Sequence, residues 1–498
     1  MVKTYKIFPP IGIARLGNSN SEYYIASESP QMNFVPPGGY RDADLKVKRM
    51  GCRFRIYEYE DSTPVREITA NEATIEWRTH LVNSKAAKDG LNPLPKEQYI
   101  IDSGYQSVRG PNQNKELKGY LRPSGHLPIE VKLGNLLTDE QGRLIVLGGH
   151  GKSASWTGSP PTGIQNAGWY DDASDGRIEA ALQFHGSGDI IFAEESWVLV
   201  GPPRFAQPLE SIVSLYDLVW DRSKLFHQNP SRPASFTGVI YPVLFRAVFM
   251  QWTNSTARSG HSGSSPGNFL RPDVFPLLHD KNATGGDALR KAVFAKLRNP
   301  QGGGGNMPLL SGGLTVTPLQ YEQFSKWSQG NYKDNWDPTW DPAQPPQPKF
   351  KNFPVAQQPD VLTEAALGAG VGGAFFPGIE AGSKMADPNT YQLPFRVSHL
   401  VRSGDLTQSL SVPWQADFKF CSESWWPAAR PGMVNYKEGG VLKYAAWDRG
   451  VNTAQDMVNL WSQLGFLAKD TTSSQLLYVE TERTLTSAML AAGASFFA

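Results

Sequence analysis

Short apolar or alternating runs, separated by turn residues, dominate the first 200 residues of the chain. Runs of four to eight such residues predict β-strands. They occur at residues 53–59, 144–147, 189–193 and 197–200. Glycine and proline are frequent between them, so we expect this part to be mostly β and sandwich-like.

Helical periodicity appears later in the chain. Residues 211–224 and 287–297 follow a helical pattern, and a short helix is expected to start at Thr363. Residues 453–464 give the clearest pattern, because their large apolar side chains recur at helical spacing and share one face. These side chains are Met457, Leu460, Trp461 and Leu464.

Together these elements predict an α+β, β-rich fold. We expect a β-rich N-terminal domain over residues 1–205 and a C-terminal mixed domain over residues 206–498. Both lengths are sufficient for a hydrophobic core.

The composition narrows the functional classes. The chain has 498 residues, of which 40% are hydrophobic and 19% charged, as in globular proteins. Its 48 Lys and Arg against 47 Asp and Glu give a net charge of +1. This balance provides no electrostatic reason to expect a nucleic acid or an anionic membrane as partner.

The opening MVKTYKIFPP is not a signal peptide, because its apolar stretch is short and ends at two prolines. No window approaches the roughly 20 apolar residues of a membrane helix. We therefore expect a soluble protein, either cytoplasmic or secreted without a classical signal.

Common cofactor motifs are absent. The two cysteines exclude a disulfide framework, and the eight histidines are scattered without metal-ligand spacing, so no metal site is expected. Glycine-rich nucleotide fingerprints are also missing. The chain is instead rich in aromatic residues, with 14 Trp, 18 Tyr and 24 Phe, and any unusual chemistry would have to come from them.

One segment combines aromatic residues with a cysteine. Residues 412–431 read VPWQADFKFCSESWWPAARP, with Asp417 four positions before Cys421. If this is a helical turn, the carboxylate and the sulfur share a face, and the carboxylate is then placed to take protons. From residue types alone, a buried aromatic core remains the more common explanation.

The segment is also part of a wider resemblance. The strings GDLTQSLSVPWQADFKFC and WWPAARP resemble the LodA-like family of lysine ε-oxidases and glycine oxidases, which use cysteine tryptophylquinone. Further matches include IFPPIGIARLGNS, NAGWYDDASDGRIEAAL and DMVNLWSQLGFL, so that the resemblance runs from Tyr5 to about Phe466.

The resemblance implies a protein-derived cofactor. In the family, a cysteine sulfur is bonded to a tryptophan whose ring is oxidised to an ortho-quinone, and an aspartate is needed for its formation. By position, these residues are Cys421, Trp461 and Asp417, with Trp447 as the second candidate for the quinone tryptophan. His399 is expected as a catalytic proton shuttle.

Other tryptophans are expected to line the pocket; these are Trp414, Trp425 and Trp426, together with Trp447 if it is not the quinone residue. The resemblance further implies an amine or amino-acid substrate, dioxygen as oxidant, a flavoprotein maturation partner, and a homo-oligomer, either a tetramer or a dimer.

Several alternatives remain open at the level of sequence. The substrate is either the lysine ε-amine or glycine or another α-amino acid. The protein is either an oxidase or a quinone dehydrogenase with a protein electron acceptor. Two hypotheses are non-enzymatic. The protein is a family member that lacks the cofactor and acts as a binding protein, or it is a carbohydrate-binding sandwich, as suggested by the tryptophan-rich DNWDPTWDP.

Overall fold

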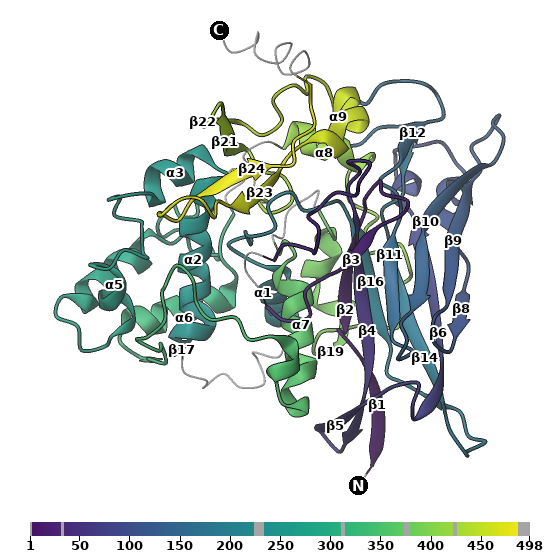
Figure 1. Cartoon of the computed structure of the whole chain (residues 1–498), viewed down its shortest axis with the longest axis horizontal. Coiled ribbons are helices and arrows are strands. Elements are labelled where there is room, and N and C mark those ends of the chain that lie inside the picture. The colour runs from purple at the N-terminus through teal and green to yellow at the C-terminus, as the bar shows by residue number, and fades with distance from the viewer. Residues whose placement is uncertain are drawn as a thin grey trace.

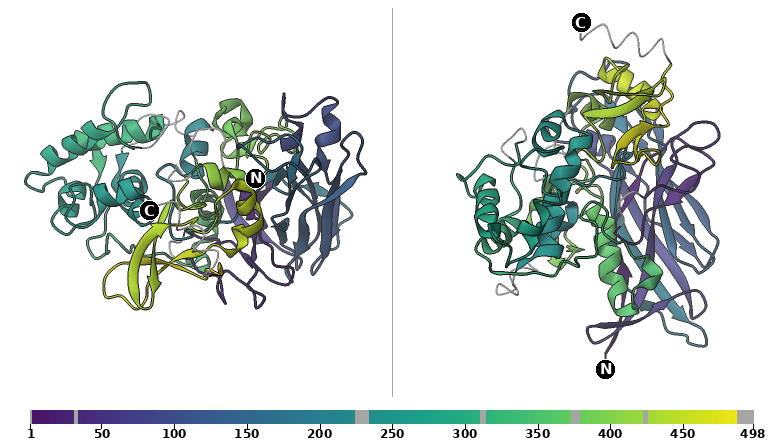
Figure 2. Two further views of the ribbon diagram at one scale, coloured as in Figure 1. Left: turned by 90° about the horizontal axis from the view of Figure 1, so that it is seen from above. Right: turned by 60° about the vertical axis from the view of Figure 1, so that its left-hand side comes forward.

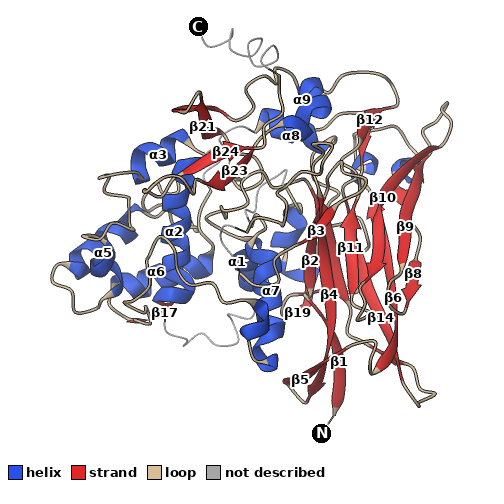
Figure 3. Cartoon of the chain, in the orientation of Figure 1, coloured by secondary structure: helices blue, strands red, loops and turns tan. Residues whose placement is uncertain are grey.

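One large sheet forms the N-terminal part of the molecule (Figures 1 and 3). In the computed structural model, which describes residues 2–30, 34–223, 234–309, 314–372, 379–421 and 426–486, the main path of this sheet is β7-β6-β14-β16-β2-β4-β11-β10-β9. The bounds are β2 Ile11–Arg15, β4 Arg49–Glu60, β6 Ala73–Asn83, β7 Ile101–Asp102, β9 Asn114–Leu121, β10 Ile129–Thr138, β11 Leu144–Gly148, β14 Ser174–Phe184 and β16 Ser196–Gly201.

The sheet curls until its ends meet. Neighbouring strands on the path are antiparallel, except that β16 runs parallel to β2. The two end strands, β7 and β9, contact each other, which makes the sheet nearly a barrel. Shorter strands extend it: β1 (Lys3–Phe8), β3 (Tyr23–Ile25) and β5 (Thr63–Ile68) pair with β4, β8 (Gln106–Arg109) pairs with β6, and β15 (Ile191–Phe192) pairs with β14.

Alternation of side chains explains how the sheet encloses its core. Along the first part of β6, Ile75, Trp77 and Thr79 are buried, while Glu76 and Arg78 between them are exposed. Successive side chains of a strand point to opposite faces, so the apolar set turns inwards. The buried indole of Trp77 satisfies its N–H by donating to the Gly142 carbonyl at 2.8 Å.

Helices occupy the other side of the molecule. In Figure 1, α2, α3, α5 and α6 are set away from the sheet, while α1 and α7 lie between them and the sheet; the two views of Figure 2 show the teal helical part apart from the sheet as well. The bounds are α1 Leu215–Arg222, α2 Tyr241–Phe249, α3 Ser255–His261, α4 Phe275–His279, α5 Gly286–Lys296, α6 Pro318–Ser328, α7 Gln358–Gly368, α8 Trp414–Phe420 and α9 Ala454–Leu460. Within the described ranges, no helix has the length and apolar character needed to cross a membrane.

Small two-stranded sheets complete the chain. β12 (Ser153–Ser155) pairs with β13 (Trp169–Asp171), and β17 (Ala234–Ser235) with β18 (Tyr332–Lys333). β19 (Tyr391–Leu393) pairs with β20 (Arg396–Val397), β21 (Met433–Glu438) with β22 (Val441–Ala446), and β23 (Phe466–Lys469) with β24 (Tyr478–Thr481).

The predicted α+β, β-rich class is confirmed, but the N-terminal part is one sheet curled nearly into a barrel where a sandwich-like arrangement was expected. The strand expected at 189–193 is only Ile191–Phe192. Helix α7 begins at Gln358, five residues before the expected Thr363, because Pro359 occupies its first turn, where a missing N–H costs no hydrogen bond. The α-helix expected over 453–464 ends at Leu460, and Trp461–Gln463 form a tighter 3₁₀ turn. The division between residues 205 and 206 stays a prediction.

A buried ion pair fixes the start of α8 on the sheet side of the molecule. The ammonium group of Lys85 lies 2.5 Å from Oδ2 of Asp171, and both side chains are fully buried. The same carboxylate accepts hydrogen bonds from the backbone N–H of Trp414 at 2.9 Å and from the side-chain amide of Asn83 at 3.0 Å. The first residue of α8 is therefore tied to a charge pair from the N-terminal part of the chain.

Loss of one partner of this pair should be costly. Lys85→Met leaves the Asp171 carboxylate buried without its counter-charge, so the free energy of unfolding should fall by about 3–5 kcal/mol. The exposed pair Arg78–Glu179 is the control, since Arg78→Met should cost no more than about 1 kcal/mol. Denaturant unfolding of the three proteins gives the comparison, and equal losses in both variants would contradict the assigned role.

Candidate active site

Helix α8 brings the predicted aspartate and cysteine together. Cys421 follows the last helical residue, and its backbone N–H donates to the Asp417 carbonyl at 2.9 Å. Its thiol donates to Oδ1 of Asp417, also at 2.9 Å. The expectation that the two groups share a helical face is confirmed.

The Asp417 carboxyl lies in an environment that favours its neutral form. It is 2% exposed, and this burial raises its pKa to about 7. The hydrogen bond from Cys421 and the positive charges of Lys85 and Arg430 limit the rise. Among the described residues, none bonds to the second carboxylate oxygen, Oδ2, in normal hydrogen-bonding geometry, although the nearby Ser411 hydroxyl also lowers the pKa of this carboxyl. At neutral pH this group therefore exchanges a proton at little cost.

The cysteine is held in its thiol form. Burial, together with the nearby Asp417 charge that accepts its hydrogen bond, raises the pKa of Cys421 well above its ordinary value. Asp417 is the carboxyl that accepts the hydrogen bond of this thiol.

Trp461 belongs to the same cluster as α8. Helix α9 packs against α8 and leads directly into Trp461. The Trp461 side chain is buried, and its ring meets the Trp414 ring edge-to-face, with centroids 5.2 Å apart and planes at 69°. Cys421 packs against the hydrophobic core that contains both rings. The structure thus places Trp461 against Trp414, on the helix that also carries Asp417, while Cys421 packs on a larger core that contains Trp447 as well.

Trp447 lies beside a different residue of α8. Its ring is fully buried, 6.1 Å from that of Phe418, and its indole N–H donates to the Gly465 carbonyl at 2.8 Å. The guanidinium of Arg430 lies 5.4 Å from the ring centroid. Trp447 is therefore held on several sides by groups that do not include Asp417 or Trp414.

The other predicted site residues, Trp425, Trp426 and His399, differ in where the structure places them. Trp426 is buried in the same core as Trp414 and Trp461, whereas Trp425 lies outside the described residues. His399 is exposed and pairs with Gln392 through Nδ1 at 2.9 Å. The strand β19, which carries Gln392, lies far below α8 in Figure 1, so the structure does not bring His399 to the cluster.

Two residues of the site were not selected from sequence. Gln415, between Trp414 and Asp417, is fully buried and donates to the Gly151 carbonyl at 3.1 Å. Gly151 in turn lies against the Trp461 ring. The only sequence signal for Gln415 was its place within PWQAD. For Gly151 the only signal was the glycine-rich string GGHG at 148–151.

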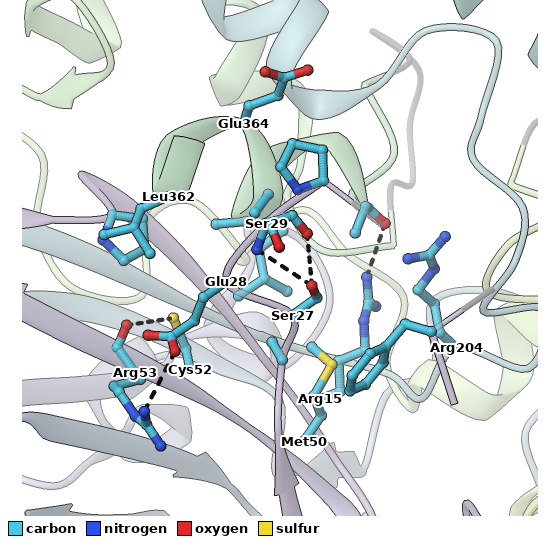
Figure 4. Close-up of a pocket in the computed structure, with 18 of the residues that line it drawn as sticks. Arg15, Ser27, Glu28, Ser29, Met50, Cys52, Arg53, Arg204, Leu362 and Glu364 are labelled. Atoms are coloured by element: carbon cyan, nitrogen blue, oxygen red, sulfur yellow. Dashed lines mark hydrogen bonds and ion pairs between the residues drawn. The ribbon is translucent and has the colours of Figure 1, made fainter. Parts of the chain in front are cut away.

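A separate cavity opens between the sheet and α7 (Figure 4). Its lining includes Arg15, Cys52, Arg204 and Glu364, but none of the cofactor candidates. Cys52 there is a buried thiol whose pKa burial raises to about 12, consistent with a structural role. No group of three or more His, Cys, Asp or Glu side chains in the described part of the chain is arranged to hold a metal ion.

Comparisons with known proteins agree with the sequence motifs. The family model for the L-lysine epsilon oxidase N-terminal region matches residues 8–96 and 92–200, and that for the L-lysine epsilon oxidase C-terminal domain matches residues 301–438. The L-lysine 6-oxidase of Marinomonas mediterranea is 25% identical over 561 residues, which cover 88% of this chain and 72% of that protein.

Solved structures show the same fold. The crystal structure of the Schiff base intermediate of L-Lys ε-oxidase from Marinomonas mediterranea with L-Lys superimposes with a TM-score of 0.78 at 20% identity, covering 97% of this chain and 95% of that one. A second structure of the ε-lysine oxidase from that organism gives a TM-score of 0.77, also at 20% identity, covering 96% and 95%.

These matches define a family of amino-acid oxidases. Within it, this chain belongs to the L-lysine ε-oxidase family, the LodA-like proteins.

The raised pKa of Asp417 predicts a pH-dependent stability. Since its pKa is higher in the folded than in the unfolded protein, folding binds a proton between about pH 4 and 7. The contribution of this group to the free energy of unfolding is therefore fully present below about pH 4 and is lost as the pH rises from about 4 to 7. Asp417→Asn removes the effect, so between pH 5 and 8 the variant should gain about 1–3 kcal/mol relative to wild type.

Unfolding by denaturant at several pH values gives the free energy of unfolding of both proteins. The contributions of the other buried carboxyls are the same in both and cancel in the difference. The exposed Asp44→Asn is the control and should leave the difference near zero. A wild-type and Asp417→Asn pair with parallel pH profiles would show that Asp417 is already ionised in the folded protein.

Proposed function

We propose that this chain oxidises an amino acid or primary amine with dioxygen through a cysteine tryptophylquinone made from Cys421 and Trp461. The products are an aldehyde or oxo acid, ammonia and hydrogen peroxide. The carrying observation is that one helix, α8, holds Asp417, which accepts a hydrogen bond from the Cys421 thiol, and Trp414, whose ring contacts Trp461.

The residues present fit the proposed group. The half-buried Cys421 thiol, the buried Trp461 indole and the buried Asp417 carboxyl supply the sulfur, the ring and a proton acceptor. When formed, the quinone supplies an electrophilic carbonyl for the substrate amine and holds the two electrons removed from the substrate.

Asp417 is the proposed acid–base residue of cofactor formation. It accepts the proton of Cys421 at Oδ1, where the thiol already donates. The same carboxyl then releases that proton near neutral pH, because its pKa is raised to about 7. Lys85 and Arg430 stabilise the carboxylate form before the proton is taken up and after it is released.

Trp461 is favoured over Trp447 by its contacts. Trp461 meets Trp414, which lies one helical turn from Asp417 and on the same face. Trp447 instead packs on Phe418 and Phe205 and uses its N–H for a backbone carbonyl.

An amino acid is the proposed substrate class, with the lysine ε-amine and glycine as the two candidates. The relative from Marinomonas mediterranea, an L-lysine 6-oxidase, supports the first. We further propose that a flavoprotein partner matures the cofactor and that the chain forms a homo-oligomer, either a dimer or a tetramer.

Peptide mass mapping tests the cofactor directly. After co-expression with the flavoprotein encoded nearby, tryptic peptides 420–437 and 450–469 should remain joined after reduction, with two oxygens gained and four hydrogens lost. Two of these hydrogens leave when the thioether replaces S–H and ring C–H, and two when ring C–H bonds become C=O. A link to peptide 444–449 would move the quinone to Trp447.

Asp417→Ala is the matched variant for this map. It should yield folded protein whose two peptides are separate and unmodified, because the proton acceptor is missing. A fully linked Asp417→Ala protein would eliminate the proposed role of the carboxyl, and an unlinked wild-type protein would leave a non-catalytic family member.

Turnover under air distinguishes the remaining alternatives. The mature protein should release one hydrogen peroxide for each ammonia with either L-lysine or glycine, and the substrate with the higher kcat/KM identifies the specificity. Cys421→Ser should lower this activity at least about 1000-fold, since the cofactor cannot form. Ammonia release that requires an added electron acceptor instead of dioxygen would identify a dehydrogenase.

A further inference from the structure

The loop between β11 and β12 lies directly on the Trp461 ring. Gly151, in this loop, has a φ of +68°. A Cβ atom added to Gly151 would lie 2.4 Å from Cζ2 and 2.9 Å from Cη2 of Trp461. These distances are shorter than any normal contact, so the backbone reaches the edge of the six-membered ring only because residue 151 is glycine.

Helix α8 holds this loop in place. The Gln415 side chain, fully buried, donates through Nε2 to the Gly151 carbonyl at 3.1 Å. Its Oε1 accepts from the Ser153 hydroxyl at 2.6 Å. One amide therefore fastens the loop on both sides of Lys152, from the same helix that places Trp414 against the Trp461 ring.

Asp172 provides a second anchor for the loop. Its carboxylate is 1% exposed and accepts from the backbone N–H of Lys152 at 3.1 Å. Gly151 is thus held from α8 on one side and from the strand β13 region on the other. The Trp461 ring thus contacts both this fixed backbone and the Trp414 ring.

We propose that Gly151 and Gln415 are positioning residues that fix the plane of the Trp461 ring for its reaction with Cys421. This proposal rests on the proposed function, in which those two residues form the cofactor. The thioether forms as the thiol and one ring carbon each lose a hydrogen, while two electrons pass to the flavoprotein or to dioxygen. A bond between two fixed side chains requires the ring carbon to face the sulfur, and small displacements lower such rates strongly.

Gly151→Ala and Gly158→Ala form a matched pair of test variants. Both glycines have a left-handed φ, +68° and +77°, so alanine strains the backbone similarly at each. Only Gly151 touches Trp461, because a Cβ at Gly158 would have no heavy atom within 4 Å. After maturation for a fixed time, we expect Gly151→Ala to contain about tenfold less of the linked peptide pair 420–437 and 450–469. Gly158→Ala should match wild type.

Gln415→Glu adds a readout that a purely structural role would not give. An ionised Glu cannot donate to the Gly151 carbonyl, whereas a protonated Glu donates to it and still accepts from Ser153. With purified precursor and flavoprotein, the linking rate of this variant relative to wild type should therefore approach one near pH 5.5 and fall several-fold by pH 8. Gln415→Met is the uncharged control, since it leaves the Asp417 charge environment unchanged and cannot donate at any pH; its ratio to wild type should be low and equal at both pH values.

The outcomes separate the two proposals. Linked wild-type protein together with equal linking in Gly151→Ala and a pH-independent ratio for Gln415→Glu would overturn the positioning role but leave the cofactor intact. Wild-type protein without any link would overturn the cofactor and the positioning role together. Should Gly151→Ala fail to fold while Gly158→Ala folds, the Gln415→Glu ratio decides alone.

Discussion

The site depends on one buried contact, in which Asp171 binds both the Lys85 ammonium and the backbone N–H of Trp414. Removing two charges from water is costly, and a buried ion pair is tolerated only when its remaining oxygens and protons are also bonded. Asp171 meets this requirement, since its other oxygen accepts from Asn83. The contact fixes where α8 begins.

Fixing the first residue of α8 is sufficient to place its other side chains, because an α-helix has a fixed pitch. Once Trp414 is placed, the positions of Gln415, Asp417 and Cys421 follow from 3.6 residues per turn. Trp414 then meets Trp461, Gln415 meets Gly151, and the Asp417 carboxylate accepts from the thiol. A helix of seven residues is not stable alone in water, so these tertiary contacts also hold it together.

The charges around α8 determine the chemistry available there. Burial alone makes the Asp417 carboxylate unfavourable, while Lys85 and Arg430 make it more favourable. Their opposition gives a pKa of about 7, the range in which one carboxyl both takes and gives a proton. Lys85 thus has two effects, since it neutralises Asp171 directly and acts on Asp417 through its field.

The sequence predicted the elements whose signal is local. The apolar run 144–147 became β11, and the spacing of Asp417 and Cys421 correctly implied a shared helical face. It could not reveal contacts between distant segments. Gln415 and Gly151 are 264 positions apart, and neither residue type marks a site by itself. Nor could it separate Trp461 from Trp447, because both are buried aromatic residues and only their neighbours differ.

Those distant contacts explain why the candidate site needs both parts of the chain. Cys421 and Trp461 come from the part beyond residue 206, as the sequence suggested. The backbone against the ring comes from Gly151, and the anchor of α8 from Lys85 and Asp171, all before residue 205. A C-terminal fragment would keep the candidate cofactor residues but lose the N-terminal groups that contact α8 and Trp461. The N-terminal contribution to the candidate site therefore comes from segments that connect the strands of the curled sheet: the 3₁₀ turn with Lys85, the loop with Gly151, and β13 with Asp171.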